Sequence, residues 1–351
     1  MSIKKGKTMD FEKLKKATGL SALYYHVPRH ANTIWYSLGG LTLFCFIMAM
    51  GSGILMSQFY SPSPSTAYAS VKYISSTPGL QLLRGFHFWS ANLGFLMLII
   101  HMLRVIITGA FRPPRTITYF VGLGLLMVIF MIYFTGTVLR WDQEGYEAIT
   151  HFMAVNKLLG PIGAIFQEDF TLSTSMLSRV FALHTSALQI IFIAILVSHI
   201  FYIKYFGISP KPYQTEEEYQ VSLDGKTTFM GHAKLLGMLS AGMFIIIFGL
   251  AAFFPPGLFH AAKPGIEVTK PAWPFWLLVP FENLIGIAGI LFGSVIVGAY
   301  LLVFPVLGLV IRGEKTLFRT VYAIVSVGLI VWFALMIITY ISPVQSHFGS
   351  H

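Results

Sequence analysis

Seven long apolar runs constrain the fold of this chain more than any other feature of its sequence. A helix needs about 20 apolar residues to cross a hydrocarbon core roughly 30 Å thick. Each run reaches that length, and the composition, with 55% hydrophobic and 11% charged residues, excludes a soluble domain. We therefore predict an all-α integral membrane protein with seven transmembrane helices, at residues 33–57, 81–109, 116–138, 177–206, 233–254, 284–310 and 318–341.

Four histidines lie inside two of these runs at matching intervals. His87 and His101 are 14 residues apart in the second run, and His184 and His199 are 15 apart in the fourth. At about 1.5 Å of rise per residue, either interval separates its imidazoles by roughly 21 to 22 Å along a helix. Ionisable residues inside a membrane are rare and mark functional sites. If the two helices are antiparallel neighbours, His87 faces His184 and His101 faces His199, near opposite surfaces.

Two imidazoles facing each other in an apolar bundle are typical of an electron-carrying haem whose iron has no open position. The four histidines therefore predict two stacked, non-covalent b-type haems in a bundle of the first four transmembrane helices. The alternative for each histidine is a polar packing residue bonded to a neighbouring carbonyl, and the shared spacing makes it the weaker interpretation. The extra residue of the 15-residue interval rotates one ring by about 100°, which we expect a tilted helix to absorb.

Paired glycines and two arginines complete the predicted haem sites. The glycines are spaced by 14 residues in the first and third runs, and a residue without a side chain lets a helix approach a flat macrocycle closely. Each arginine lies three residues from a histidine, where a guanidinium can meet a propionate or can instead reach the membrane interface. The residues are Gly39, Gly53, Gly122, Gly136, Arg84 and Arg104.

These residues carry a resemblance to a known family. The chain resembles cytochrome b, and more closely its cytochrome b6 type, in which the second histidine pair is spaced by 15. The resemblance covers residues 25–210 and thins beyond 230. The stretches that carry it are VPRHANTIWYSLGG (27–40), TAYASVKYI (66–74), RGFHFWSAN (84–92), RVIITGAFRPPR (104–115), RWDQEGYEA (140–148) and LHTSAL (183–188).

The resemblance implies a domain organisation and a function. A cytochrome b6-like dihaem bundle would span residues 1–210, a connector 211–232, and a three-helix domain like subunit IV 233–351. The chain would then be the dihaem subunit of a bc-type quinol–cytochrome c oxidoreductase, which oxidises quinol at the outer surface and reduces quinone near the inner one. Implied partners are a Rieske iron–sulfur protein, a c-type cytochrome and a second copy of the chain, and the quinone type stays open.

Two positions depart from the family pattern. A cysteine that holds an additional c-type haem in many members is replaced by Ser37, and serine cannot form the thioether bond, so we predict no covalent haem. The Pro-Glu-Trp-Tyr motif reads Pro271, Ala272, Trp273, Pro274, and alanine cannot accept a proton. Another acid must take that role, or the chemistry of the outer site is altered. The acids available are Glu144, Glu147, Glu267 and Glu282.

The segment RWDQEGYEAIT (140–150) is the predicted quinol edge. An aromatic ring beside several acids at a membrane surface can supply a wall and proton acceptors for quinol oxidation. An interfacial aromatic anchor with solvated acids is the alternative. Glu282 is also a candidate because it falls among apolar residues near the start of a span, where burial raises the pKa of a carboxyl group. The predicted catalytic residues are Trp141, Asp142, Glu144 and Glu282.

The net charge of +10 follows the membrane topology, so we predict no nucleic-acid partner. When the spans alternate, 17 of the 24 lysines and arginines fall on the side of the N-terminus. The positive-inside rule then places the N-terminus in the cytoplasm and the C-terminus outside, in the cytoplasmic membrane of a bacterium. Residues 9–18 are expected to form an amphipathic helix on the lipid surface. The other seven histidines are interpreted as ordinary surface or loop residues, with His30 and His232 weak candidates for the inner quinone site.

Two other functions stay open at this stage. The chain could be a dihaem membrane anchor that passes electrons between the quinone pool and an external multihaem cytochrome or reductase, without a bifurcating site. Both the missing glutamate and Ser37 leave room for that function. A haem-free transporter or scaffold is the third hypothesis, and the four spaced histidines argue against it.

Overall fold

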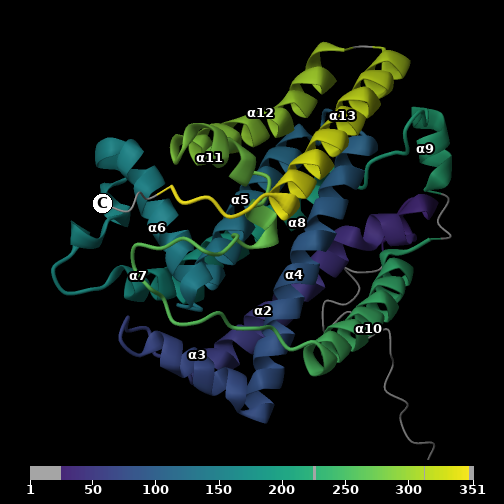
Figure 1. Cartoon of the computed structure of the whole chain (residues 1–351). Helices are drawn as coiled ribbons and strands as arrows, with labels where there is room; N and C mark the ends of the chain where they lie inside the picture. Colours follow the sequence, from purple (N-terminus) through teal and green to yellow (C-terminus); the bar gives the residue numbers. More distant parts are fainter. Residues whose placement is uncertain (1–24, 224–226, 312, 348–351) are drawn as a thin grey trace, which may run out of the picture.

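The computed structural model describes residues 25–223, 227–311 and 313–347, and the regular structure in them is helical (Figure 1). Seven helices are long and apolar enough to cross a membrane, which confirms the predicted number. The predicted amphipathic helix at 9–18 lies outside the described residues. The seven are α2 (Ile34–Ser57), α4 (Pro78–Ile107), α5 (Thr116–Val138), the continuous α7 and α8 (Met176–Phe206), α10 (Phe229–Phe253), α12 (Ala288–Val310) and α13 (Glu314–Ile341).

In the described ranges, four shorter α-helices lie outside these spans: α3 (Ala67–Ser76), α6 (Gln143–Leu158), α9 (Glu216–Ser222) and α11 (Val279–Ile285). The last of them corrects a predicted boundary. The apolar run at 284–310 was expected to form one helix, but the chain turns at Gly286, where φ is +72°, and α12 starts only at Ala288. A left-handed residue cannot continue an α-helix, and glycine adopts that conformation without steric cost.

The first four spans form two tightly packed helix pairs. Helix α2 packs along α4, and α5 packs along α8, whereas α4 and α5 touch at few points. The chain runs up one helix and down the next, so α2 and α5 finish at the end of the bundle where α4 and α7 begin (Figure 1). The space between the two pairs is therefore lined by all four helices, and His87, His101, His184 and His199 all belong to them.

A π turn at Leu183–Ala187 accounts for the 15-residue histidine interval. A π turn closes on the residue five positions away and so accommodates one residue more than an α turn. His184 lies inside this turn, and the side chain of Gln189 donates to its carbonyl oxygen at 2.9 Å. The extra residue is thus taken up within the helix, rather than by the tilt that the sequence suggested.

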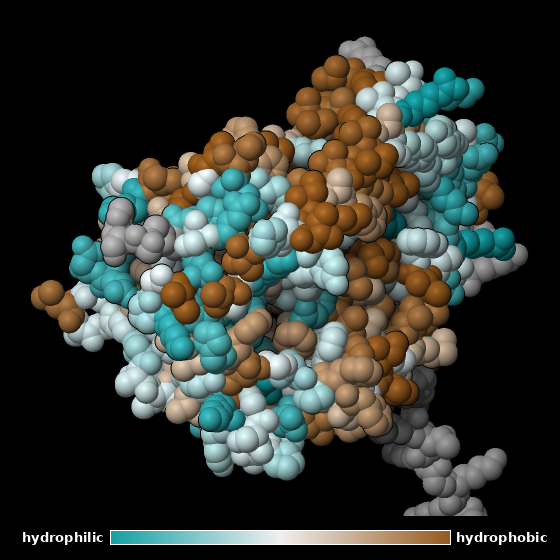
Figure 2. All heavy atoms as spheres, in the orientation of Figure 1, coloured by the Kyte–Doolittle hydropathy of each residue, from teal (hydrophilic) through white to brown (hydrophobic). Residues whose placement is uncertain are grey.

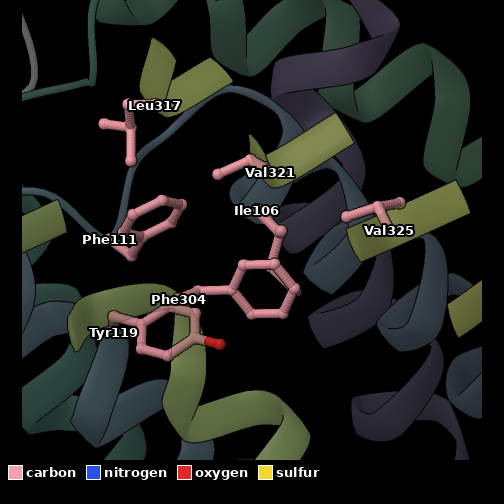
Figure 3. Close-up of a cluster of buried hydrophobic side chains, with 7 residues drawn as sticks. All are labelled: Ile106, Phe111, Tyr119, Phe304, Leu317, Val321 and Val325. Atoms are coloured by element: carbon pink, nitrogen blue, oxygen red, sulfur yellow. The ribbon is translucent and has the colours of Figure 1, made fainter. Parts of the chain in front are cut away.

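The C-terminal helices are anchored to this bundle by a buried apolar cluster (Figure 3). Phe304 of α12 is fully buried between Phe111 and the helices α4 and α13. The hydroxyl of Tyr119 on α5 donates to the carbonyl of Leu301 at 2.8 Å. The cluster joins spans six and seven to spans two and three. The long segment between α10 and α11 lies nearer the His87–His184 region, because its residues 268–273 line the same cavity as these two histidines. The buried members are Ile106, Phe111, Tyr119, Phe304, Leu317, Val321 and Val325.

The surface has the pattern expected of a membrane protein. Figure 2 shows hydrophobic residues in a broad band over α12, α13 and α10, and hydrophilic residues gathered around α6 and around α9. Large apolar side chains inside the spans are exposed, among them Ile245, Val295 and Ile330, at 62 to 70%. Such exposure is favourable in lipid and costly in water.

Candidate functional site

His87 and His184 meet between the two helix pairs. Their ring centroids lie 6.4 Å apart and the ring planes are inclined by 72°. Metal–imidazole bonds are about 2 Å long, so two of them in line, plus roughly 1 Å from each nitrogen to its ring centroid, separate the centroids by roughly 6 Å. The spacing of this pair therefore fits a single metal atom bound by both imidazoles.

Hydrogen bonds set which nitrogen of each ring is free. Nδ1 of His87 donates to the carbonyl oxygen of Ala49 at 2.8 Å. Nδ1 of His184 lies 2.9 Å from the hydroxyl oxygen of Thr135, which itself donates to the carbonyl of Met131. Since each Nδ1 is used as a donor, each neutral imidazole presents an unprotonated Nε2, which is the form that binds a metal.

The four predicted glycines each face one histidine. A Cβ atom on Gly53 would lie 3.0 Å from Cε1 of His87, and one on Gly136 would lie 3.0 Å from Cε1 of His184. The same relation holds between Gly39 and His101, at 2.9 Å, and between Gly122 and His199, at 3.2 Å. The glycines were expected to admit the macrocycle, and in the structure they admit the imidazoles, whose rings any larger side chain would displace.

His101 and His199 form the second pair, on the other half of the bundle. Each ring faces a glycine of a neighbouring helix, Gly39 of α2 for His101 and Gly122 of α5 for His199. Nδ1 of His101 is buried and has no hydrogen-bond partner among the described residues. Arg104 stands beside this pair: its Nε donates to the carbonyl of Trp35 at 3.2 Å and its guanidinium lies 4.5 Å from the ring centre of Tyr36.

A cavity of about 880 Å³ adjoins the first pair. It offers space beside the two imidazoles for a macrocycle. Arg84, only 7% exposed, is part of its wall and donates to the carbonyls of Pro256 and Gly257 at 2.6 and 2.8 Å. Arg84 thus points inward instead of reaching the membrane interface. The cavity is lined by all four bundle helices, including Gly53, Arg84, His87, Asn92, Tyr133, Gly136 and His184, and by the segment 268–273.

A second cavity of about 280 Å³ lies beside the first. Its walls are mainly apolar, with Phe134 of α5 and Phe275 among them, and its polar groups include carboxylates and histidines. Both cavities are bounded by Glu144 and by Pro271 and Ala272 of the altered motif. The ionisable groups on its wall are Glu144, Glu147, His151, Glu267, Lys270, Glu282 and His347.

The four predicted catalytic residues divide into two groups. Glu144 and Glu282 line the second cavity, whereas Trp141 and Asp142 are not among the residues that line either cavity. Asp142 is fully buried and caps α6 by accepting from the backbone of Gly145, and it also binds Arg140 at 2.5 Å. The indole of Trp141 donates to the carbonyl of Pro64. Trp141 and Asp142 thus make contacts that stabilise the local structure, and their catalytic role stays a prediction.

Arg140 holds Glu144 at the boundary between the two cavities, at 2.8 Å. Burial raises the pKa of the Glu144 carboxyl group, the charge of Arg140 lowers it, and the balance is a raised pKa. The pKa of Arg140 is also raised, because its two acidic partners outweigh its burial. Glu144 is therefore an acid on the cavity wall with a fixed cationic partner.

His151 is the site residue that sequence reasoning missed. We interpreted it as ordinary because no partner lies at ligand spacing, but its Nε2 is 3.0 Å from both Glu267 and Glu282. His347 from the C-terminal segment lies beside the same two carboxylates, at 3.9 and 3.7 Å. No local pattern could have indicated this cluster, because its members come from four separate segments.

Of the weak candidates at the other end of the bundle, His30 is buried and His232 is half-buried. Nε2 of His30, which is 5% exposed, lies 2.9 Å from the carbonyl of Ser209. Burial lowers the pKa of His30, which favours the neutral imidazole. No further function for His30 or His232 follows from these contacts.

The fold and the paired histidines define the class: a transmembrane helical bundle whose imidazoles meet in pairs between helices. The family model for cytochrome b/b6/petB matches residues 23–207. The cytochrome b6 of Heliobacterium modesticaldum is 38% identical over 188 residues, which make up 52% of this chain and 88% of that protein. The chain therefore belongs to the cytochrome b/b6 family, and it is a membrane protein of electron transport that binds b-type haem.

A solved structure extends the likeness in fold beyond residue 207. A chain of a complex described as a hyperthermophilic respiratory Complex III matches with a TM-score of 0.70 and 20% sequence identity. The match covers 95% of this chain and 98% of that chain. Spans five to seven therefore share that fold as well, although the cytochrome b6 relative aligns to only about half of this chain.

Proposed function

We propose that this chain is the dihaem cytochrome b subunit of a bc-type complex that oxidises quinol. One observation carries the proposal: a mainly apolar cavity with carboxylates on its wall adjoins the histidine-lined cavity and shares Glu144, Pro271 and Ala272 with it. Oxidation of quinol releases protons and electrons together, so it needs proton acceptors and an electron acceptor side by side. The two adjoining cavities supply these two functions.

His87 and His184 would hold one haem, and His101 and His199 the other. A bis-imidazole haem takes up one electron at a time and passes it on without binding substrate. The inward guanidinium of Arg84 is suited to a propionate, because arginine offers five donors and the two carbonyl contacts leave others free. The buried hydroxyl of Ser37 donates to the carbonyl of Thr33 at 3.0 Å, and with serine here we propose no covalent haem.

The smaller cavity would bind the quinol ring. Phe134, Phe152 and Phe275 provide apolar contacts, and Glu144 and Glu282 lie where a quinol hydroxyl could give up its proton. We retain quinone reduction near the His101–His199 pair as part of the proposal. The same is true of a Rieske protein and a c-type cytochrome as partners, of a homodimer, and of a cytoplasmic N-terminus in a bacterial membrane.

Quinol-driven reduction of the purified complex tests the proposal. Reduced-minus-oxidised spectra and pyridine haemochrome assays should give two b-type haems per chain, and adding a quinol should reduce both. Subunit analysis of the same preparation should show an iron–sulfur protein. Two haems that dithionite reduces and quinol does not, with no iron–sulfur subunit, would favour the membrane-anchor function, which the alanine at position 272 leaves open.

A further inference from the structure

We propose that Glu282 and His151 form the proton-accepting pair of the smaller cavity and take the place of the acid that position 272 lacks. The inference rests on the proposed function, because it assumes that quinol is oxidised in this cavity. Both side chains line the cavity, and so does Ala272. Glu282 is only 7% exposed, so its carboxyl group is directed into the protein rather than toward solvent.

The contacts of His151 require a proton on Nε2. Its Nδ1 donates to the carbonyl oxygen of Glu147 at 2.7 Å, so that nitrogen is already used. Its Nε2 lies 3.0 Å from one carboxylate oxygen of Glu267 and 3.0 Å from one of Glu282. Ionised carboxylates only accept hydrogen bonds, so these contacts are favourable when the ring is an imidazolium.

The surroundings of His151 favour that charged form. Burial by itself would lower the pKa of His151. The hydrogen bond and charge of Glu282, the carbonyl of Glu147 and the charge of Glu267 act in the opposite direction, and the balance raises the pKa. Two carboxylates around one imidazolium leave a net negative charge, and such a group can take up one further proton.

Three other charged groups on the cavity wall are engaged by partners outside the His151 cluster. Glu144 is bound to Arg140 at 2.8 Å. The Glu147 carboxylate accepts from Gln143 and from the backbone of Val268 and Thr269. The ammonium group of Lys270 donates to the carbonyl of Tyr340 at 2.6 Å. Glu282, by contrast, has as its charged neighbours His151 and, at 3.7 Å, His347.

The step is a proton transfer. The O–H bond of a quinol hydroxyl breaks, an O–H bond forms on Glu282, and the quinol is left as its anion. The anion would give one electron to the haem and one to the external one-electron acceptor of the proposed function, and the proton of its second hydroxyl would leave by the same route after the first proton has been passed on. His151 then gives its Nε2 proton to Glu267 and receives the proton of Glu282. Glu267 also accepts the backbone N–H of His347, so the proton has moved toward the C-terminal segment.

Glu282→Gln tests the pair most directly. The purified complex is mixed rapidly with a quinol, and haem reduction is followed from about pH 6 to about pH 9, a range that spans histidine titration. General-base catalysis contributes about 10²-fold or more, so we expect a loss of at least about tenfold. The loss should be larger at low pH, because the remaining acceptor, His151, is then protonated. Glu168→Gln, in an exposed loop outside the cavity, is the matched control and should react like the parent.

A carboxylate placed elsewhere on the same wall provides the rescue. Ala272→Glu in the Glu282→Gln background should restore most of the lost rate, which a purely structural role of Glu282 would not allow. Haem spectra are recorded for every variant. If Glu282→Gln lowers the haem content, His151→Gln is compared in its place, and it should also slow haem reduction.

The outcomes separate the two hypotheses. A parent complex that does not oxidise quinol contradicts the proposed function. A parent complex that does, together with a haem-loaded Glu282→Gln or His151→Gln variant that reacts at the parent rate over the whole pH range, overturns the proton-accepting pair alone.

Discussion

Both histidine pairs consist of two imidazoles, but the pairs differ in the hydrogen bonds that hold the rings. Nδ1 of His87 and of His184 has a hydrogen-bond acceptor, in Ala49 and Thr135, whereas Nδ1 of His101 has none among the described residues. The first pair also lines the larger cavity, which adjoins the smaller one. Two haems held as proposed would therefore lie in different environments, since a hydrogen bond at Nδ1 raises the basicity of the ligand nitrogen and so tunes the metal.

Replacing one of the predicted haem-ligand histidines should have the largest effect on haem content, and the effect on reduction by quinol should differ between the two pairs. We expect His184→Ala and His199→Ala each to lower the haem content from two to one per chain, measured by pyridine haemochrome. Only His184→Ala should also abolish fast reduction of the remaining haem by quinol, because the lost haem is the one beside the smaller cavity. His260→Ala, at an exposed position, is the control. Equal quinol reactivity of the two ligand variants would contradict the assignment of the cavity.

The glycines provide an intermediate test. Gly53→Val should displace the ring of His87 and lower haem occupancy at the first pair, because even a Cβ at this position lies 3.0 Å from the imidazole. Gly51→Val in the same helix is the matched control, since a Cβ there has no atom outside its local helix within 4 Å. Haem stoichiometry and the reduced spectrum distinguish the two variants. If both bind two haems, close packing of glycine against histidine is not needed for the site.

A smaller effect is expected from the hydrogen bond to His184. Thr135→Val removes the oxygen that accepts from Nδ1, so the imidazole becomes a weaker donor to the metal and the reduced state is favoured. A lost neutral hydrogen bond of about 1 kcal/mol corresponds to a midpoint potential raised on the order of tens of millivolts. Redox titration of the two haems should show the rise in one of them. Thr42→Val, a buried threonine whose hydroxyl bonds only within α2, should shift neither.

The number of transmembrane helices could be predicted from the sequence with little ambiguity. Apolar runs such as 116–138 coincide with a helix at both ends, because the limits of the apolar stretch and of the membrane core are set by the same energetic cost. The predicted start of the helix in the run at 284–310 was wrong, since hydropathy does not report a left-handed residue such as Gly286. For Trp141 and Asp142, chemical type indicates what a side chain can do and not which cavity it faces, so their catalytic role stays a prediction.

The sequence by itself determined the membrane environment, the positions of the four histidines and the glycines spaced to match them, because helical periodicity and lipid solvation act locally along the chain. Only the tertiary structure decided that Gly53 faces His87 and Gly136 faces His184, and that a π turn absorbs the fifteenth residue. It also brought His151, Glu267, Glu282 and His347 together. Contacts between distant segments depend on how whole helices pack, and the spacing of residues within one segment does not determine that packing.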